Sequence, residues 1–453
     1  MRLLLSSLLL FSGVIVSAQA ARVDVGAKSD GLGGLSALFA AQSRVEPRST
    51  ALSLEEAERI ALERNPDIAV GARKVAVSKA HLPISGSLED PEVMYRAWGV
   101  PLNQPENLNA AKNMFSISQR LPGRGKRTLE RSIAGTDVDI AESQLEQVRL
   151  EVRVRVRKAY NDLLRAQEEM RIHDQHVMLA SQAIEAARIK YAVGKVSQQD
   201  ILKAQVVFTG LAEHMIRFDE DAEVARERLN TLLGRDVETP IRAMGSYEAP
   251  GALPSLYDLE AIALASRPDL RAAGQMVERR RKEQALAGKA MTPDFTVTGG
   301  YMLMQPSAAM RNSYMLEGSM NLPWLNKGKH RAEVAEASQS LIEQNAERDA
   351  LRNAAFGQIE EALVGARSAG KLATVYHDQL RPQAEMTLQA SVIAYENGKT
   401  DFLDLLDSQM TVINVDLAWL QAAADYDARV ADLELATGSL LDRSKSASPE
   451  VKP

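Results

Sequence analysis

The sequence of 453 residues contains no cysteine, and aromatic residues make up only 5% of it. Without cysteine the chain has neither a disulfide framework nor an N-terminal cysteine to carry a lipid anchor. The scarcity of aromatic residues beside 45% hydrophobic residues, many of them Ala, Leu and Val, favours long helices over β-sandwiches. These absences leave packing and protein surface as the sources of stability and of any membrane attachment.

Long apolar runs and a strong net charge are also missing. After residue 20, no run approaches the roughly 18 apolar residues of a spanning helix, so any membrane crossing would be made by strands. The formal net charge is -6, and the short basic stretch Arg279-Arg280-Arg281 lies among Glu and Gln without aromatic residues to stack on bases. A nucleic-acid partner is therefore not expected.

The first twenty residues, MRLLLSSLLLFSGVIVSAQA, have the pattern of a cleaved export signal. Arg2 gives a basic start, an apolar run follows, and the closing Ala-Gln-Ala supplies the small residues of a cleavage site. Residues 1–20 are therefore predicted to be a signal peptide. Residues 21–50, rich in Gly, Ser and Ala, are expected to form a flexible lead of the exported chain.

One turn sequence occurs twice, as YAVGKVSQQDIL at residues 191–202 and as YENGKTDFLDLL at residues 395–406. The Tyr, Gly and Asp residues of the two stretches keep one constant separation. The openings SLEEAERIALERNPDI (53–68) and SLYDLEAIALASRPDL (255–270) recur at nearly the same offset. The chain is therefore predicted to be a tandem duplication of about 200 residues per copy. We expect repeats at residues 51–239 and 255–440, a Pro/Gly-rich linker at 240–254, and a tail at 441–453.

Each repeat is expected to contain a short helix, a second helix, a β-hairpin and two long helices. Alternating apolar residues predict β-hairpins at residues 92–121 and 294–322, followed by helical hairpins at 124–234 and 329–438. In the first helical hairpin, apolar residues recur in steps of three and four with no proline, which predicts a coiled-coil rod of about 100 Å. Ser197 is suited to cap the returning helix.

Four strands of about ten residues are tall enough to cross an outer membrane when tilted. Their outer edges would leave amides unpaired in lipid, so the sheet has to close through other copies of the chain. Barrels of this kind start at eight strands, and three copies would give twelve. The alternative is a soluble hairpin folded onto the helices, as in a periplasmic coiled-coil scaffold.

In these motifs the sequence resembles the TolC-like outer-membrane efflux channel family. The resemblance covers residues 50–440 through the duplicated openings, the Leu-Pro…Gly-Lys stretches between strands and helices, and both Tyr-x-x-Gly-Lys turns. It implies a mainly α fold with a small β part: a tandem-duplicated α-helical coiled-coil barrel and four transmembrane β-strands per chain. The strands would close as a 12-strand β-barrel in a homotrimer. The implied location is the bacterial outer membrane, with the helical part in the periplasm.

The function that the resemblance implies is a passive exit duct of a tripartite efflux system, with no cofactor. A periplasmic adaptor protein would dock on the helical turns, and an inner-membrane transporter of the resistance-nodulation-division type would deliver the substrate. SQRLPGRGKR and DPEVMYRAWGVP look more like the heavy-metal branch than the multidrug branch, so the expected cargo is metal cations or small toxic compounds. A multidrug or type I secretion duct is the alternative. An enzyme is not expected, because no nucleophile–base pair or complete metal-ligand set occurs.

The resemblance assigns a pore gate to Asp404 and Asp407, which lie three apart and share one helix face. Three copies would place six carboxylates around a narrow lumen, an arrangement that favours cations and discourages anions. The plainer interpretation is that Asp near a helix start serves as a cap.

Other residues around the turns also match family positions. Asp200, Tyr191 and Tyr395 match positions that tie neighbouring helices together in the closed state. Many members carry a basic residue where this chain has Thr400, so the family's closed-state salt bridges are not expected in full. The turns expected to dock the adaptor consist of Gly194, Lys195, Gly398 and Lys399.

Three further patterns resemble ligand sites. GRGKRT at residues 123–128 is superficially like a phosphate loop, but Arg127 stands at the Ser/Thr site. His173 and His176 have a chelating spacing but no evident third ligand, so packing or surface roles are favoured. Methionines of the β region offer soft ligands to Cu(I) or Ag(I), although methionine more often fills apolar gaps. They are Met94, Met114, Met302, Met304, Met310, Met315 and Met320.

Overall fold

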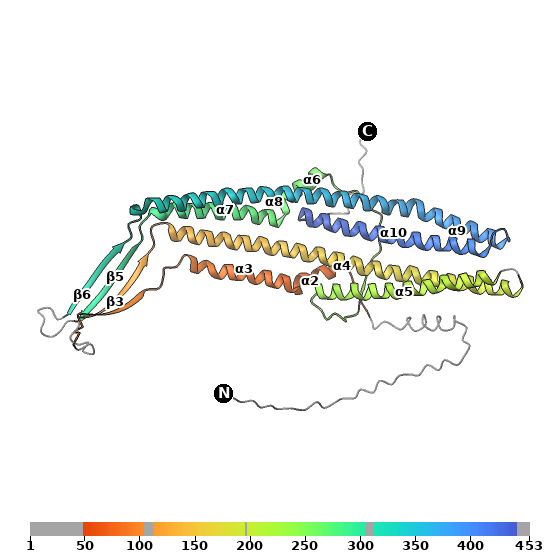
Figure 1. Cartoon of the computed structure of the whole chain (residues 1–453), viewed down its shortest axis with the longest axis horizontal. Helices are drawn as coiled ribbons and strands as arrows, with labels where there is room; N and C mark the ends of the chain where they lie inside the picture. The colour runs from red at the N-terminus through yellow and green to blue at the C-terminus, as the bar shows by residue number, and fades with distance from the viewer. Residues whose placement is uncertain (1–48, 101, 104–111, 195–196, 304–311, 442–453) are drawn as a thin grey trace, which may run out of the picture. The chain divides into compact units, whose positions relative to one another are not determined.

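The computed structural model describes residues 49–100, 102–103, 112–194, 197–303 and 312–441. Two helices, two strands and a long helical hairpin occur in this order twice (Figure 1), and the predicted mainly α fold with a small β part is confirmed. The first set consists of α2 (Leu54–Arg64), α3 (Pro66–Ser85), β2 (Glu92–Trp98), β3 (Lys112–Leu121), α4 (Lys126–Ala192) and α5 (Gln198–Leu232). The second consists of α6 (Leu256–Ser266), α7 (Pro268–Gly288), β5 (Phe295–Leu303), β6 (Asn312–Met320), α8 (Lys327–Val375), α9 (Arg381–Glu396) and α10 (Phe402–Thr437), with short 3-10 turns at Lys289–Met291 and Pro323–Asn326.

α4 runs unbroken because its apolar residues recur at the spacing of a buried seam. Val152, Val156, Leu163 and Ala166 are each 2% exposed or less. Full burial of a Val or Leu side chain contributes about 1.5–3 kcal/mol, so a seam of this length stabilises the rod along its whole course. The helix packs on α3, α5, α7 and α10, and this places the two halves of the duplication side by side.

The second hairpin differs from the single long helix that we expect from residue 329 to 396. After Val375 the helix widens into a π-helical turn, Tyr376–Leu380, before α9 begins. Pro382 stands at the start of α9 and lacks an N–H group. Its ring would also clash with the carbonyl four residues earlier in a regular α-helix. The wider turn removes that conflict without ending the helix.

The strands form one antiparallel sheet in the order β2-β3-β5-β6. Directly paired residues lie on the same face, so the register separates two faces. One face carries an aromatic row, Tyr95-Phe115-Tyr301-Tyr314, in which neighbouring rings lie 5.0 and 5.4 Å apart. The opposite face carries polar residues such as the row Glu92-Ser118-Thr298-Glu317. Within the described residues, the outer edges of β2 and β6 have no partner strand.

A second, short sheet packs in the core of the first repeat. β1 (Thr50–Leu52) pairs in parallel with β4 (Ile241–Ala243), and the Tyr160 hydroxyl donates to the Leu52 carbonyl at 2.8 Å. The expectation of a flexible lead up to residue 50 is therefore wrong at its end, because Thr50 lies in a strand. The linker at 240–254 likewise contains a strand. Most of the expected lead, the signal peptide and the tail after residue 441 lie outside the described residues.

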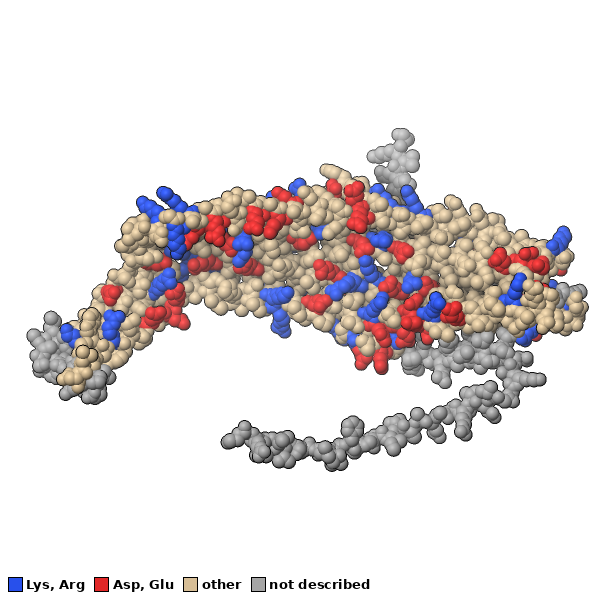
Figure 2. Space-filling model, viewed as in Figure 1, with Lys and Arg blue, Asp and Glu red and all other residues tan. Residues whose placement is uncertain are grey.

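The middle of the helical part contains a buried ion cluster. Glu434 has no exposed surface, and its carboxylate accepts from Arg157 at 2.7 Å and from the Leu441 N–H at 3.1 Å. Arg157 also donates to Glu58, so three helices share one guanidinium. Figure 2 shows charged side chains of both signs gathered over this middle region, around α2 and the end of α5. None of the described helices has the length and apolar character needed to cross a membrane.

Candidate functional site

The turn between α9 and α10 is closed by backbone hydrogen bonds around a glycine. Gly398 has a φ of 68°, which an L side chain adopts only with strain. Its N–H donates to the Tyr395 carbonyl at 3.2 Å, and the Lys399 N–H donates to the Ala394 carbonyl at 2.9 Å. Because α9 ends in these bonds, the exposed Gly398 and Lys399 are held at the tip of the hairpin.

α10 begins with carboxylates that cap its first turn. The Asp401 side chain accepts from the Asp404 N–H at 3.0 Å, and the Thr400 hydroxyl donates to the Asp404 carboxylate. The Thr400 contact thus joins the residue before the cap to the first turn of α10.

Asp404 and Asp407 begin a polar stripe on α10. Both side chains are exposed, and Thr411 and Asn414 continue the exposed stripe at helical spacing. The opposite side of the same helix is buried and includes Leu405 and Leu406 with the nearby Phe402, Val412 and Ile413. The structure therefore brings the two predicted gate carboxylates together on a free face of α10.

The turn between α4 and α5 has a similar design. Gly194 has a φ of 75°, and its N–H donates to the Tyr191 carbonyl at 2.8 Å. Ser197 and Asp200 form a reciprocal capping box, in which the Asp200 carboxylate accepts from the Ser197 hydroxyl at 2.8 Å and from its N–H at 3.0 Å. The predicted tie from Asp200 to a neighbouring helix remains a prediction. Lys195 lies outside the described residues.

The two turns lie close together through a contact between the repeats. Lys190, near the end of α4, places its ammonium 3.5 Å from the ring centroid of Tyr395 at the end of α9. Tyr395 also packs on Phe402 at 5.9 Å between ring centroids, and its buried hydroxyl has no hydrogen-bond partner among the described residues. Tyr191 is 46% exposed. Tyr395, one of the three predicted closed-state residues, thus contacts the other hairpin.

The chain is similar to known proteins over most of its length. The sequence profile of the outer membrane efflux protein family matches residues 59–235 and 260–439, one match in each half of the duplication. The chain belongs to the outer membrane efflux protein family. The resemblance to TolC-like channels is therefore confirmed, and with it the expected function class, an outer-membrane efflux channel of tripartite systems.

Relatives and solved structures of the outer membrane efflux family cover most of the chain. The cobalt-zinc-cadmium resistance protein CzcC of Cupriavidus metallidurans is 24% identical over 388 residues, which are 83% of this chain and 88% of CzcC. The outer membrane protein TolC of Vibrio cholerae is 22% identical, over 67% of this chain and 71% of TolC. The crystal structure of CusC has the same fold, with a TM-score of 0.72 at 16% identity, covering 88% of this chain and 96% of CusC.

The family also indicates the class of protein, the kind of partner and the location that its members have. Members of the outer membrane efflux family are channel proteins rather than enzymes, and they work with adaptors and inner-membrane pumps. The family's location is the outer membrane.

The two histidines that suggested a metal pair have different surroundings. His173 is 1% exposed, and its Nε2 lies 2.8 Å from the Leu211 carbonyl. Burial lowers the pKa of His173 and outweighs this hydrogen bond, which acts in the opposite direction. Its ring packs against His214 and Phe218 of α5. Sequence reasoning missed this pairing because it depends on the register between α4 and α5. His176 faces α10 instead.

The stretch that resembled a phosphate loop binds a carboxylate of the other repeat. The Asp294 side chain, only 13% exposed, accepts from Lys126 Nζ and from the Gly123 N–H, both at 2.7 Å, and from Arg120 at 3.2 Å. Burial alone would raise the pKa of Asp294, but these hydrogen bonds outweigh it and lower the pKa. Sequence reasoning missed Asp294, because its partners Arg120, Gly123 and Lys126 lie in the other repeat.

Four of the methionines share one face of the sheet. Met114 pairs directly with Met302, while Met94 and Met315 lie one row away on the same, polar face. The Met94 sulfur accepts from Arg96 at 3.4 Å, so a cation rather than a metal-binding group stands beside it. Met320 lies on the opposite face, and Met304 and Met310 lie outside the described residues. Whether these methionines contact a soft metal stays a prediction.

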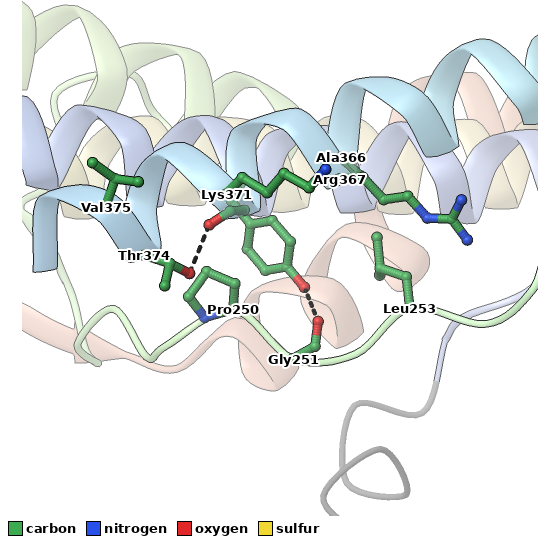
Figure 3. A pocket seen from close by; sticks show the side chains of 10 residues that line it. Pro250, Gly251, Leu253, Ala366, Arg367, Lys371, Thr374 and Val375 are labelled. Atoms are coloured by element: carbon green, nitrogen blue, oxygen red, sulfur yellow. Dashed lines mark hydrogen bonds between the residues drawn. The ribbon is translucent and has the colours of Figure 1, made fainter. Parts of the chain in front are cut away.

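A groove of about 520 Å³ lies between the inter-repeat linker and α8 (Figure 3). Pro250 and Leu253 form one wall, while Lys371 and Thr374 of α8 contribute to the other. The Tyr426 hydroxyl of α10 donates to the Gly251 carbonyl at 3.1 Å, which fixes the linker on the second repeat. The groove thus forms where the linker crosses α8. The residues that line it do not belong to either of the two turns.

Proposed function

We propose that three copies of this chain form the exit duct of a tripartite efflux system for metal cations. The observation that carries the proposal is the unfinished sheet: β2 and β6 both have an outer edge without a partner strand in the described part of the chain. In lipid each unpaired backbone group costs several kcal/mol, so these edges have to pair with other copies. Four strands from each of three copies give the expected barrel of twelve.

The two faces of the sheet suit such a barrel. The aromatic row and the neighbouring Val93, Ile117 and Leu316, which are 78%, 53% and 84% exposed, would contact lipid. The polar face would line the water-filled lumen.

The helical part also offers surfaces for neighbouring copies. Val70, Val77 and Ile84 recur every seven residues along α3 and are 56%, 69% and 64% exposed. Such a stripe is typical of a helix that packs on another helix. In the proposed trimer it would be covered by the next subunit.

The gate would be the ring that Asp404 and Asp407 form around the lumen. Both carboxylates lie on the exposed stripe of α10 close to the hairpin tip. Three copies would therefore bring six carboxylates together at the periplasmic mouth. A ring of carboxylates favours cations. Adaptor hairpins would bind the turns at Gly194-Lys195 and Gly398-Lys399, favour a dilated helix arrangement, and thereby widen the ring.

Single-channel conductance in a planar bilayer tests the gate. With Asp404→Asn and Asp407→Asn combined, we expect lower cation selectivity and lower cation conductance, because the ring that attracts cations is removed while the helix cap at Asp401 is kept. Glu396→Gln is the matched control, since it removes an exposed carboxylate at the same hairpin outside the stripe. Unchanged selectivity and conductance in the double variant would refute the gate assignment.

One relative and the charge of the proposed gate support metal cations as the cargo. CzcC is a cobalt-zinc-cadmium resistance protein, and a carboxylate ring passes cations. A deletion strain should therefore become more sensitive to divalent metal cations, and the intact chain should restore tolerance. If metal tolerance is unchanged while sensitivity to organic drugs increases, the metal proposal is wrong and the duct belongs to a multidrug system.

A further inference from the structure

A carboxylate on α10 lies between cations from both helical hairpins. Asp416 is half-way along α10 and its side chain is 15% exposed. His176 of α4 approaches one of its oxygens, with 3.8 Å between Nε2 and Oδ2. Arg381, at the start of α9, approaches the other, with 3.0 Å between Nε and Oδ1. Three helices from the two repeats therefore meet at one carboxylate.

The contact between Asp416 and Arg381 is an ion pair without a hydrogen bond. Its Nε and the Asp416 Oδ1 are close but not aligned for a hydrogen bond, and neither atom has another hydrogen-bond partner among the described residues. Arg381 has a second carboxylate within reach, Glu385 at 3.3 Å, and its guanidinium lies 5.5 Å from the Trp419 ring centroid. Asp416 thus keeps acceptor capacity for a second cation, and His176 is the group that faces it.

The surroundings of this contact allow the hairpins to move. Directly beside His176 lies a cavity of about 120 Å³ between the two hairpins, lined by Leu211 of α5, Leu388 of α9 and Ile413 of α10. Apolar walls of this kind slide more easily than interlocked polar ones, because no hydrogen bonds have to break. Arg381 directly follows the π-helical turn Tyr376–Leu380, a feature that often occurs at functional positions in helices.

We propose that Asp416 is a positioning residue that clamps the first helical hairpin to the second, and that the clamp tightens when His176 is protonated. This inference rests on the proposed channel function, because the clamp acts on the helix movement that widens the Asp404/Asp407 ring. The clamp lies well inside the helical part, away from the turns, and is distinct from the Lys190–Tyr395 contact at the tip.

Charged and titratable groups from three neighbouring helices surround His176. From α10 it faces Asp416, and behind that carboxylate stands Arg381 of α9. On α4 its neighbour is the buried His173, whose ring packs on His214 of α5. When His176 is charged it gains attraction to Asp416. When it is neutral, Arg381 alone holds the carboxylate and α4 is released.

The test is the pH dependence of opening in planar bilayers between about pH 5.5 and 7.5, which brackets the ordinary pKa of histidine. The wild-type channel should have lower conductance at the acid end, by about twofold, the size expected of one partly buried ion pair. Asp416→Asn should have the higher conductance at both pH values. His176→Arg should have the lower conductance at both, because its charge is permanent.

Asp432→Asn is the matched control, since it also removes an α10 carboxylate that pairs with α4, through Lys158 in the middle of the helical part. It should keep the wild-type pH profile. If the wild type conducts and Asp416→Asn and His176→Arg both reproduce its conductance and pH profile, the clamp is refuted while the channel function stands. If the wild type forms no pore at all, the channel function and the clamp fail together. A melting temperature for each variant separates loss of folding from loss of the clamp.

Discussion

At the residue scale, the charged contacts that matter most join the two repeats rather than neighbouring residues. Asp294 of the second repeat binds Lys126 and Gly123 of the first, directly where strands give way to helices. Most surface ion pairs contribute between 0 and about 1 kcal/mol, but partly buried hydrogen bonds to a charged group contribute about 1.5–3 kcal/mol. Asp294 is of the second kind, so it fixes the strand-to-helix connection.

Replacing Asp294 should destabilise the fold by an amount that depends on pH. Asp294→Asn should lower the melting temperature at neutral pH, because Lys126 and Arg120 lose their charged partner. The folded-state pKa of Asp294 is lowered, so its stabilisation is complete above the unfolded value near about 4 and is lost as pH falls through the folded value. The difference between wild type and variant should therefore shrink on acidification.

Thermal unfolding of both proteins in detergent at neutral and acid pH measures that difference. Glu89→Gln is a suitable control, because Glu89 also contacts Arg120 but its side chain is 62% exposed, and its removal should have little effect at any pH. A gap between wild type and Asp294→Asn that stays the same at acid pH would contradict the assignment.

At the element scale, local sequence patterns predicted the features that depend on side-chain spacing and on the backbone preference of single residues. The long helices, the two glycine turns and the capping role of Ser197 follow from apolar spacing and from residues with one dominant backbone preference. The π-helical turn was not predicted, because Pro382 alone permits a kink, a break or a wider turn. The short pairing of β1 with β4 was missed because strands of three residues carry no periodicity.

In the candidate site as well, the sequence predicted what helical spacing decides and missed the contacts between distant segments. Helical spacing predicts that Asp404 and Asp407 share a face, and the exposed stripe of α10 agrees. Contacts between distant segments were out of reach, since Lys190 on Tyr395 and His176 beside Asp416 depend on the register of one hairpin against the other. The sequence contains no local signal of that register.

At the scale of the whole molecule, we propose that one chain supplies part of a barrel wall that other copies complete. In the part of the chain that the structure describes, the sheet has two edges without a partner strand, and α3 exposes a regular apolar stripe. Both features are costly for a protein that works alone, and both are satisfied when identical copies are arranged around an axis. The proposed Asp404/Asp407 gate would act only in such a ring, because a pair of exposed carboxylates on one chain encloses no pore.

The mass of the assembly tests this account most directly. Native mass spectrometry of the protein extracted from outer membranes in mild detergent should give three times the mass of the mature chain, without a partner protein. A single copy as the stable species, in the same extract and at concentrations where the fold is intact, would contradict the trimer and the exit duct built on it.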